Sequence, residues 1–208
     1  MVGVPKLNTM IAIIDYGMGN LRSVQKAFEQ VGGQALVTHT PADVFKADKV
    51  VLPGVGAMAA AMQKINELGL ADAIRKVTRE GKPFLGICLG LQLLFEQSSE
   101  GGYTEGLRIL KGRVDRFSQG KVPHMGWNQL KFCPVAAKLA DGLSDGENVY
   151  FCHSYFVKPT DPGIAAAWTT YGMAYVSAIV SGNIWGVQFH PEKSQAVGLK
   201  ILQNFASL

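Results

Sequence analysis

The first half of the chain alternates between short apolar runs and amphipathic stretches. The apolar runs are typical of strands buried on both faces of a sheet, and they span residues 10–15, 35–38, 49–52 and 83–87. Between them, apolar residues recur at three- and four-residue steps, which predicts helices over residues 21–31, 57–68, 70–80 and 89–97. Asn20 is placed to cap the first helix and Gly32 to end it. Strands that alternate with helices predict an α/β fold in which helices cover both faces of a parallel sheet.

The pattern changes after Ser98, where strand-like alternation replaces helical periodicity. The segments predicted as strands lie within 107–132 and at 150–157, 164–170, 175–180 and 184–189, and a helix is expected over 194–206. We therefore predict a mixed, mostly parallel sheet with an antiparallel extension. Residues 10–208 are expected to form a single domain, preceded by a flexible arm over residues 1–9.

Composition excludes several classes of protein. The 208 residues are 48% hydrophobic and 17% charged, which indicates a globular chain and not a disordered one. The net charge of +4 is too small to indicate a nucleic-acid partner. No apolar run approaches the ~20 residues of a membrane span, and the first residues do not resemble a secretory signal. The three cysteines, Cys88, Cys133 and Cys152, are odd in number and widely spaced, which favours a reducing compartment such as the cytoplasm.

Cys88 lies between a predicted strand and a predicted helix, with Gly86 and Gly90 two places to either side. Glycine permits the close backbone approach that a sharp strand-to-helix turn requires. Such a turn presents its apex side chain at the carboxyl end of a strand, where α/β folds place ligands. The partial positive charge of a helix amino terminus favours thiolate over thiol. Cys88 is thus a candidate nucleophile, and the alternative is an ordinary buried cysteine.

His190 and Glu192 follow the last predicted strand and are separated by Pro191. In an extended chain, residues two apart point the same way. A carboxylate bonded to one imidazole nitrogen orients the ring, and the other nitrogen can then face a thiol. The pair is therefore a candidate general acid and base for Cys88. The alternative is a solvated loop.

The glycine-rich segment 53–56 follows another predicted strand and should lie at the same sheet edge. Its backbone N–H groups, together with the amide of Leu89, are placed to form an oxyanion hole. A plain strand-to-helix turn is the alternative. The sequence has no phosphate-binding P-loop, and its four histidines are too scattered along the chain to predict a metal site.

At these residues the chain resembles the class I, triad-type glutamine amidotransferases. Residues 86–92 look like the nucleophile motif of that family, and residues 189–192 look like its base motif. Five further segments, at 15–20, 53–57, 122–128, 153–155 and 190–194, resemble the glutaminase subunits of imidazole glycerol phosphate synthases. The resemblance runs from about Met10 to the carboxyl terminus. Departures from the family pattern are Leu91, Cys152 and Phe156.

The resemblance implies a flavodoxin-like glutaminase fold that needs no cofactor. It implies a catalytic triad of Cys88, His190 and Glu192. It also implies an oxyanion hole at Val55 and Leu89, and a glutamine site formed by Gly54, Gln92, Ser154 and Tyr155.

The ammonia from glutamine needs an acceptor, and the chain has no room for a second catalytic domain. The resemblance implies that the acceptor site belongs to a cyclase subunit of (β/α)8 fold, which forms a heterodimer with the glutaminase. That subunit would form imidazole glycerol phosphate and aminoimidazole carboxamide ribonucleotide in histidine biosynthesis. Lys193 is a candidate contact beside the site, with plain solvation as its alternative, and Trp127 is a second candidate that is equally suited to core packing.

Two other functions remain possible on the sequence. One is another cysteine hydrolase of similar fold, such as a peptidase-like or chaperone-like protein. The other is a non-catalytic interaction subunit that keeps the fold. Labelling of Cys88 by a glutamine-mimicking electrophile would distinguish the first alternative, and any turnover through a thioester would exclude the second.

Overall fold

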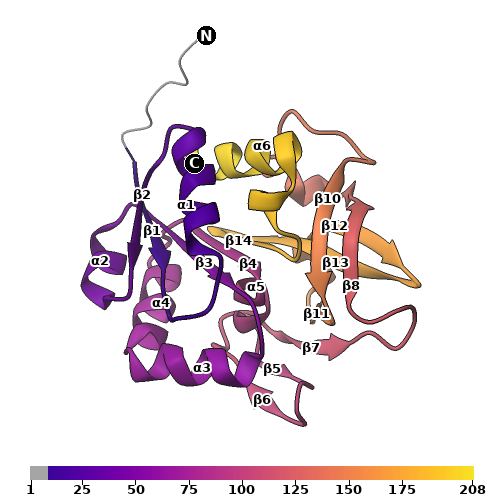
Figure 1. Ribbon diagram of the computed structural model, residues 1–208, viewed down its shortest axis with the longest axis horizontal. Coiled ribbons are helices and arrows are strands. Elements are labelled where there is room, and N and C mark those ends of the chain that lie inside the picture. The colour runs from indigo at the N-terminus through magenta and orange to yellow at the C-terminus, as the bar shows by residue number, and fades with distance from the viewer. Residues whose placement is uncertain (1–8) are drawn as a thin grey trace.

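Five parallel strands form the centre of the protein in a computed structural model, which describes residues 9–208 (Figure 1). Their order across the sheet is β2-β1-β3-β4-β14, and all neighbours in this set run parallel. They are β1 (Met10–Ile14), β2 (Gln34–Thr38), β3 (Lys49–Gly54), β4 (Phe84–Cys88) and β14 (Ile184–Val187). The predicted flexible arm lies outside the described residues except for Thr9.

A mainly antiparallel extension continues the described sheet beyond β14. It contains β13 (Met173–Ser181), β12 (Ala165–Tyr171), β11 (Tyr155–Pro159), β7 (Gly112–Arg116) and the short strands β5 (Gln97–Ser98), β6 (Thr104–Glu105) and β9 (Lys131–Phe132). Among the paired strands described in this extension, β5 and β7 alone run parallel. A separate two-stranded sheet pairs β8 (His124–Gln129) with β10 (Asn148–His153). The predicted fold class, a mostly parallel sheet with an antiparallel extension, is confirmed.

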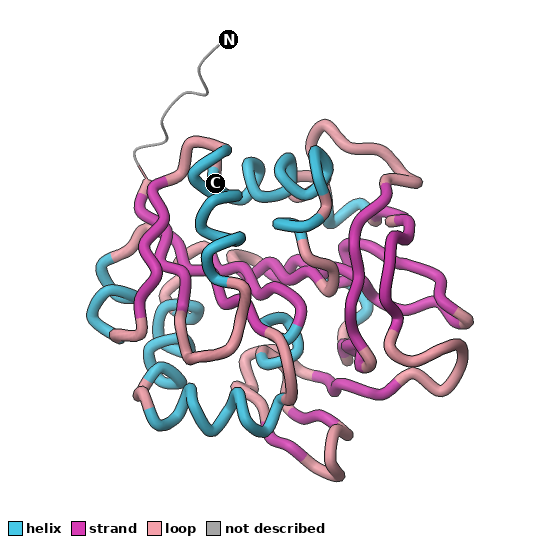
Figure 2. Tube along the Cα trace, viewed as in Figure 1, coloured by secondary structure: helices cyan, strands magenta, loops and turns pink. Residues whose placement is uncertain are grey.

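Helices cover both faces of the parallel strands (Figure 2). One face carries α1 (Leu21–Gln30) and α6 (Gln195–Ala206), and the other carries α2 (Pro41–Lys46), α3 (Met58–Glu67), α4 (Leu70–Arg79) and α5 (Leu89–Leu93). Three 3-10 turns complete the structure at Pro134–Ala136, Pro162–Ile164 and Pro191–Lys193. No helix in the described part of the chain is long and apolar enough to cross a membrane.

The position of β1 between two layers of helices explains why its residues are apolar. Ile11 and Ile13 pack in the same cluster as Phe28 of α1 and Phe205 of α6. Ile14 packs in the cluster on the opposite face, with α3 and α4. Because successive side chains of a strand point to opposite faces, a strand covered on both sides needs apolar residues at every position.

The structure corrects four details of the predicted elements. Helix α2 was not predicted. Helix α5 ends at Leu93 and not at residue 97, because the backbone N–H groups of residues 107–110 bond to the carbonyls of residues 93–95 and turn the chain away. The segment 150–157 is two strands that break at Ser154, since β10 pairs with β8 whereas β11 pairs with β7 and β13. Asn20 makes no side-chain capping bond to α1.

Candidate active site

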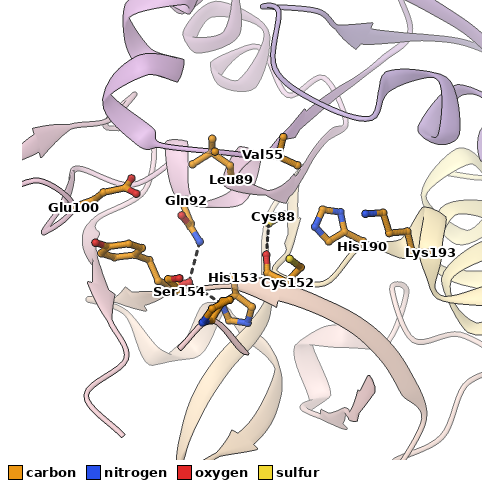
Figure 3. A pocket seen from close by; sticks show the side chains of 13 residues that line it. Val55, Cys88, Leu89, Gln92, Glu100, Cys152, His153, Ser154, His190 and Lys193 are labelled. Atoms are coloured by element: carbon orange, nitrogen blue, oxygen red, sulfur yellow. Dashed lines mark hydrogen bonds between the residues drawn. The ribbon is translucent and has the colours of Figure 1, made fainter. Parts of the chain in front are cut away.

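The carboxyl ends of β3 and β4 meet at one pocket. Gly54 and Cys88 are register partners at the last position of these two strands. The pocket beyond them has a volume of about 300 Å³ (Figure 3). It is lined by all the residues expected to carry the chemistry except Gly54 and Glu192, namely Val55, Cys88, Leu89, Gln92, Ser154, Tyr155 and His190.

Cys88 adopts the backbone conformation expected of a nucleophile at a sharp turn. Its φ is 54° and its ψ is −109°, a combination that a side chain disfavours. The two flanking glycines make the turn possible. A Cβ on Gly90 would collide with the backbone of Leu52, and one on Gly86 would lie 2.8 Å from the backbone oxygen of Gly90. The turn therefore fixes the sulfur in the lining of the pocket, where Gln188 Nε2 lies 3.7 Å from it.

His190 and Glu192 form a buried pair beside this sulfur. Their Nδ1 and Oε1 atoms lie 2.9 Å apart, and the two side chains are only 5% and 2% exposed. The connecting chain is a 3-10 turn, Pro191–Lys193, and not the extended segment that was predicted. The pair still forms, because the turn brings the carboxylate of Glu192 back onto the ring.

The electrostatics of His190 favour a protonated ring. Burial lowers its pKa, but hydrogen bonds to Cys88 and to Glu192 and the charges of both groups outweigh burial and raise the pKa to about 10. At neutral pH the ring therefore carries a proton on each nitrogen. One N–H faces the carboxylate and the other is available to a group bound at the sulfur.

The glycine-rich segment 53–56, which begins in the last two residues of β3, forms another part of the pocket wall. The Val55 side chain is 41% exposed, whereas Gly54 is buried against Tyr16 and Leu89. A Cβ on Gly54 would collide with the Tyr16 hydroxyl and lie 3.0 Å from the Leu89 Cβ, so the close approach requires glycine. Leu89 is the first residue of α5, and the first N–H groups of a helix have no partner within the helix. Both backbone segments thus border the space above the sulfur.

The Gln92 side chain links α5 to two neighbouring segments of the chain, at Tyr155 and at Gln188. Its Nε2 atom donates hydrogen bonds to the backbone oxygen of Tyr155 and to Gln188 Oε1, each at 3.0 Å. The Tyr155 oxygen also lies 2.8 Å from His153 Nδ1, which identifies that nitrogen as a donor. Gln92 therefore ties the backbone at Tyr155 to α5, and His153 bonds to the same oxygen from β10.

Two features of the site were not predicted from the sequence. Glu100 lines the pocket, and its carboxylate is held by the backbone N–H of Met58 at 2.7 Å. His124 and His153 lie side by side, because β8 and β10 place them as register partners. The facing ring nitrogens are 3.3 Å apart, and the Tyr175 hydroxyl lies 3.2 Å from His124 Nδ1 and 3.3 Å from His153 Nε2.

The histidine pair predicts a loss of stability in mild acid. Burial lowers the pKa of His124 to about 4 and that of His153 to about 3. The unfolded chain binds these protons near pH 6.5, whereas the folded chain does not. The free energy of unfolding therefore has its full value above pH 6.5, and it falls as the pH drops towards the folded-state pKa values of about 4 and 3. We expect the free energy of unfolding to fall by roughly 2–4 kcal/mol between pH 6.5 and 5. Urea unfolding at several pH values measures this.

A matched pair of variants isolates the histidine contribution from that of the carboxylates. His124→Gln should reduce the slope of stability against pH by up to about 1.4 kcal/mol per pH unit. His39→Gln removes an exposed histidine outside the buried pair and is the matched control. Equal slopes in all three proteins would contradict the assignment.

The two candidate contact residues lie together near the pocket. The Trp127 side chain is 49% exposed and meets the Tyr150 ring edge-on, with the ring centroids 6.0 Å apart. Lys193 lines the pocket, and its Nζ lies 5.8 Å from the centroid of the same Tyr150 ring. Core packing was the alternative to partner contact for Trp127. It is wrong as complete burial, since about half of the residue faces solvent. Figure 3 shows the His190 ring between Cys88 and Lys193.

Comparison with known proteins identifies the family. The family model for class I glutamine amidotransferases matches residues 12–207. The chain belongs to the class I glutamine amidotransferases. The family match therefore covers nearly all the described residues, including every residue assigned above to the pocket.

Relatives narrow the position of this amidotransferase within the family. It is 52% identical to the imidazole glycerol phosphate synthase subunit HisH of Geobacter metallireducens, over 94% of this chain and 97% of the relative. It is 53% identical to the subunit of the same name from Syntrophotalea carbinolica, over 96% of this chain and 100% of the relative. The predicted resemblance to this group of subunits is confirmed.

A solved structure supports the fold independently. The crystal structure of a glutamine amidotransferase superposes with a TM-score of 0.75 at 18% sequence identity, and the match covers 99% of this chain and 100% of the other. The amidotransferase fold is thus present over the whole described chain.

Proposed function

We propose that the protein hydrolyses glutamine to glutamate and ammonia, and that it serves as the glutaminase subunit of an imidazole glycerol phosphate synthase. The observation that carries this proposal is the buried His190–Glu192 pair, 2.9 Å apart, which presents a protonated ring to Cys88 at a glycine-flanked turn. A nucleophile, a proton carrier and an orienting carboxylate are the groups that acyl transfer from an amide requires.

In the proposed reaction the Cys88 thiolate attacks the carboxamide carbon of glutamine. The carbonyl oxygen becomes an oxyanion, which accepts hydrogen bonds from the backbone amides of Val55 and Leu89. His190 then protonates the departing nitrogen, so the carbon–nitrogen bond breaks and ammonia leaves a thioester on the sulfur. The ring, now neutral, takes a proton from water, and the resulting hydroxide attacks the thioester. Glutamate leaves, and the thiolate and protonated ring are restored.

Several groups are placed to orient glutamine in the pocket. We assign the glutamine site to Gln92 and to the backbone at Gly54, Ser154 and Tyr155. The bonds from Gln92 and His153 to the Tyr155 oxygen support this assignment because they hold that wall of the pocket in place. Glu100 brings a carboxylate to the same pocket, which suits the ammonium group of a free amino acid.

The ammonia acceptor in this proposal is a second protein. Relatives that match almost end to end are named as subunits of imidazole glycerol phosphate synthase, which supports a heterodimer with a cyclase subunit of (β/α)8 fold. That subunit would use the ammonia to form imidazole glycerol phosphate and aminoimidazole carboxamide ribonucleotide. Half-exposed Trp127 and exposed Lys193 are our candidates for its contact surface. The three free cysteines fit a cytoplasmic location.

We expect the isolated subunit to hydrolyse glutamine slowly, and glutamate production to rise at least about tenfold when the cyclase subunit and its acceptor nucleotide are added. The physical reason is that binding energy from the partner can be used to order the oxyanion-binding backbone around Val55, which is half-exposed in the free subunit. Glutamate release is measured for the subunit alone, with the partner, and with the partner and nucleotide together.

The control for this experiment is Lys193→Ala, which removes a charge at the pocket rim without altering the triad. If Lys193 contacts the partner, this variant needs more cyclase subunit to reach the same activation. Full glutaminase activity in the isolated subunit would contradict the coupling, while activation by nucleotide without the cyclase would contradict the identity of the partner.

A further inference from the structure

A second thiol shares the pocket with the candidate nucleophile. Cys152 lies in β10 and lines the same pocket as Cys88, and both cysteines are free. The burial pattern of β10 alternates, so Cys152 and Tyr150 share the partly exposed face while Phe151 and His153 face the core. The mechanism gives the Cys152 side chain no part.

The two cysteines are close neighbours in space. The Cys88 sulfur lies 4.0 Å from the backbone oxygen of Cys152. Figure 3 shows the Cys152 sulfur beside the dashed line that joins these two atoms. Cys152 belongs to the two-stranded sheet of β8 and β10, which shares no strand pairing with the main sheet. A disulfide requires the Cys152 side chain to turn towards the Cys88 sulfur by rotation about its Cα–Cβ bond.

We propose that Cys152 is a resolving cysteine, which forms a reversible disulfide with Cys88 when hydrogen peroxide oxidises the nucleophile. The inference rests on the proposed function only in taking Cys88 as a reactive thiolate. The two modified residues are Cys88 and Cys152, and the oxidant is a peroxide.

The chemistry balances in two steps. The Cys88 thiolate attacks one oxygen of hydrogen peroxide, the oxygen–oxygen bond breaks, and hydroxide leaves, so the sulfur becomes a sulfenic acid. The Cys152 thiol then attacks that sulfur, a sulfur–sulfur bond forms, and the sulfenic hydroxyl leaves with the Cys152 proton as water. The first step uses Cys88 as the thiolate nucleophile of the proposed mechanism. The disulfide blocks further oxidation of Cys88 to sulfinic acid, which thiols do not reverse.

The test treats the full-length protein with hydrogen peroxide, blocks remaining thiols with an alkylating reagent, and maps peptides by mass spectrometry without reduction. We expect a cross-linked Cys88–Cys152 peptide in the parent protein and in Cys133→Ser, and its absence in Cys152→Ser. Cys152→Ser should instead accumulate sulfinic acid at Cys88. After dithiothreitol, the parent should recover at least about ten times more free Cys88 thiol than Cys152→Ser, each relative to its own untreated sample.

The peptide masses do not depend on glutamine turnover, so failure of the proposed function would leave this test intact. Sulfinic acid at Cys88 with free Cys152 in the treated parent would overturn the proposal. A cross-link to Cys133, or equal recovery of thiol in the parent and Cys152→Ser, would overturn it too.

Discussion

Replacing Cys88 with alanine should lower the rate of glutamine hydrolysis by a factor of about 10⁴–10⁶, the loss seen when a covalent nucleophile is removed from a catalytic triad. Alanine keeps the backbone and leaves a small gap, so the protein should still fold. The measurement is glutamate release at saturating glutamine, in the presence of the cyclase subunit and its nucleotide. Thermal unfolding of the variant shows whether the fold is retained.

A matched control and a second variant make this result specific. Cys133→Ala changes a cysteine outside the pocket lining and should keep the parent rate. Because triad members act as a unit, Cys88→Ala combined with His190→Ala should cost no more than Cys88→Ala alone. A glutamine-mimicking electrophile should label Cys88 in the parent. A Cys88→Ala protein that hydrolyses glutamine at the parent rate would refute the mechanism, and absent labelling would favour another cysteine hydrolase.

The parallel half of the fold could be predicted because its signals are local. In β1, Ile11 and Ile14 face opposite clusters of the core, and the sequence records this as an unbroken apolar run. Helix α2 escaped prediction because only Val44 of its six residues is buried, which leaves almost no periodicity to detect. The early end of α5 is set by bonds to residues 107–110, which lie in another part of the chain. Tertiary contacts of this kind override local preference.

The contrast between local signals and tertiary contacts also separates the predicted parts of the site from the unpredicted ones. Cys88 with its glycines, and His190 with Glu192, are patterns within five residues, and short-range geometry is enough to suggest their chemistry. The contact between His124 and His153 depends on the register of β8 and β10, which no short pattern specifies. Glu100 likewise reaches the pocket through its bond to the start of α3. Side chains that meet through sheet pairing need the fold first.

Replacing Gly90 with alanine should be the most destabilising single change at the nucleophile turn. In an open helix alanine is favoured over glycine by about 1 kcal/mol, so propensity alone predicts a gain. Here the new Cβ would collide with the Leu52 backbone oxygen and lie 2.7 Å from its carbonyl carbon. A backbone atom in a central strand cannot move aside as a flexible side chain can. We therefore expect a loss of at least about 3 kcal/mol in the free energy of unfolding.

Gly182→Ala is the matched control, because a Cβ there meets open space while its φ of +58° strains any side chain. It should cost about 1–2 kcal/mol, the penalty of left-handed backbone without a steric clash. Urea unfolding of both variants measures the difference, and glutamate release reports the turn itself. Folded Gly90→Ala protein should lose activity by a factor of roughly 100 or more, since the Cys88 sulfur moves when β3 and α5 separate. A Gly90→Ala protein as stable as Gly182→Ala would show that α5 does not lie against Leu52 as closely as described.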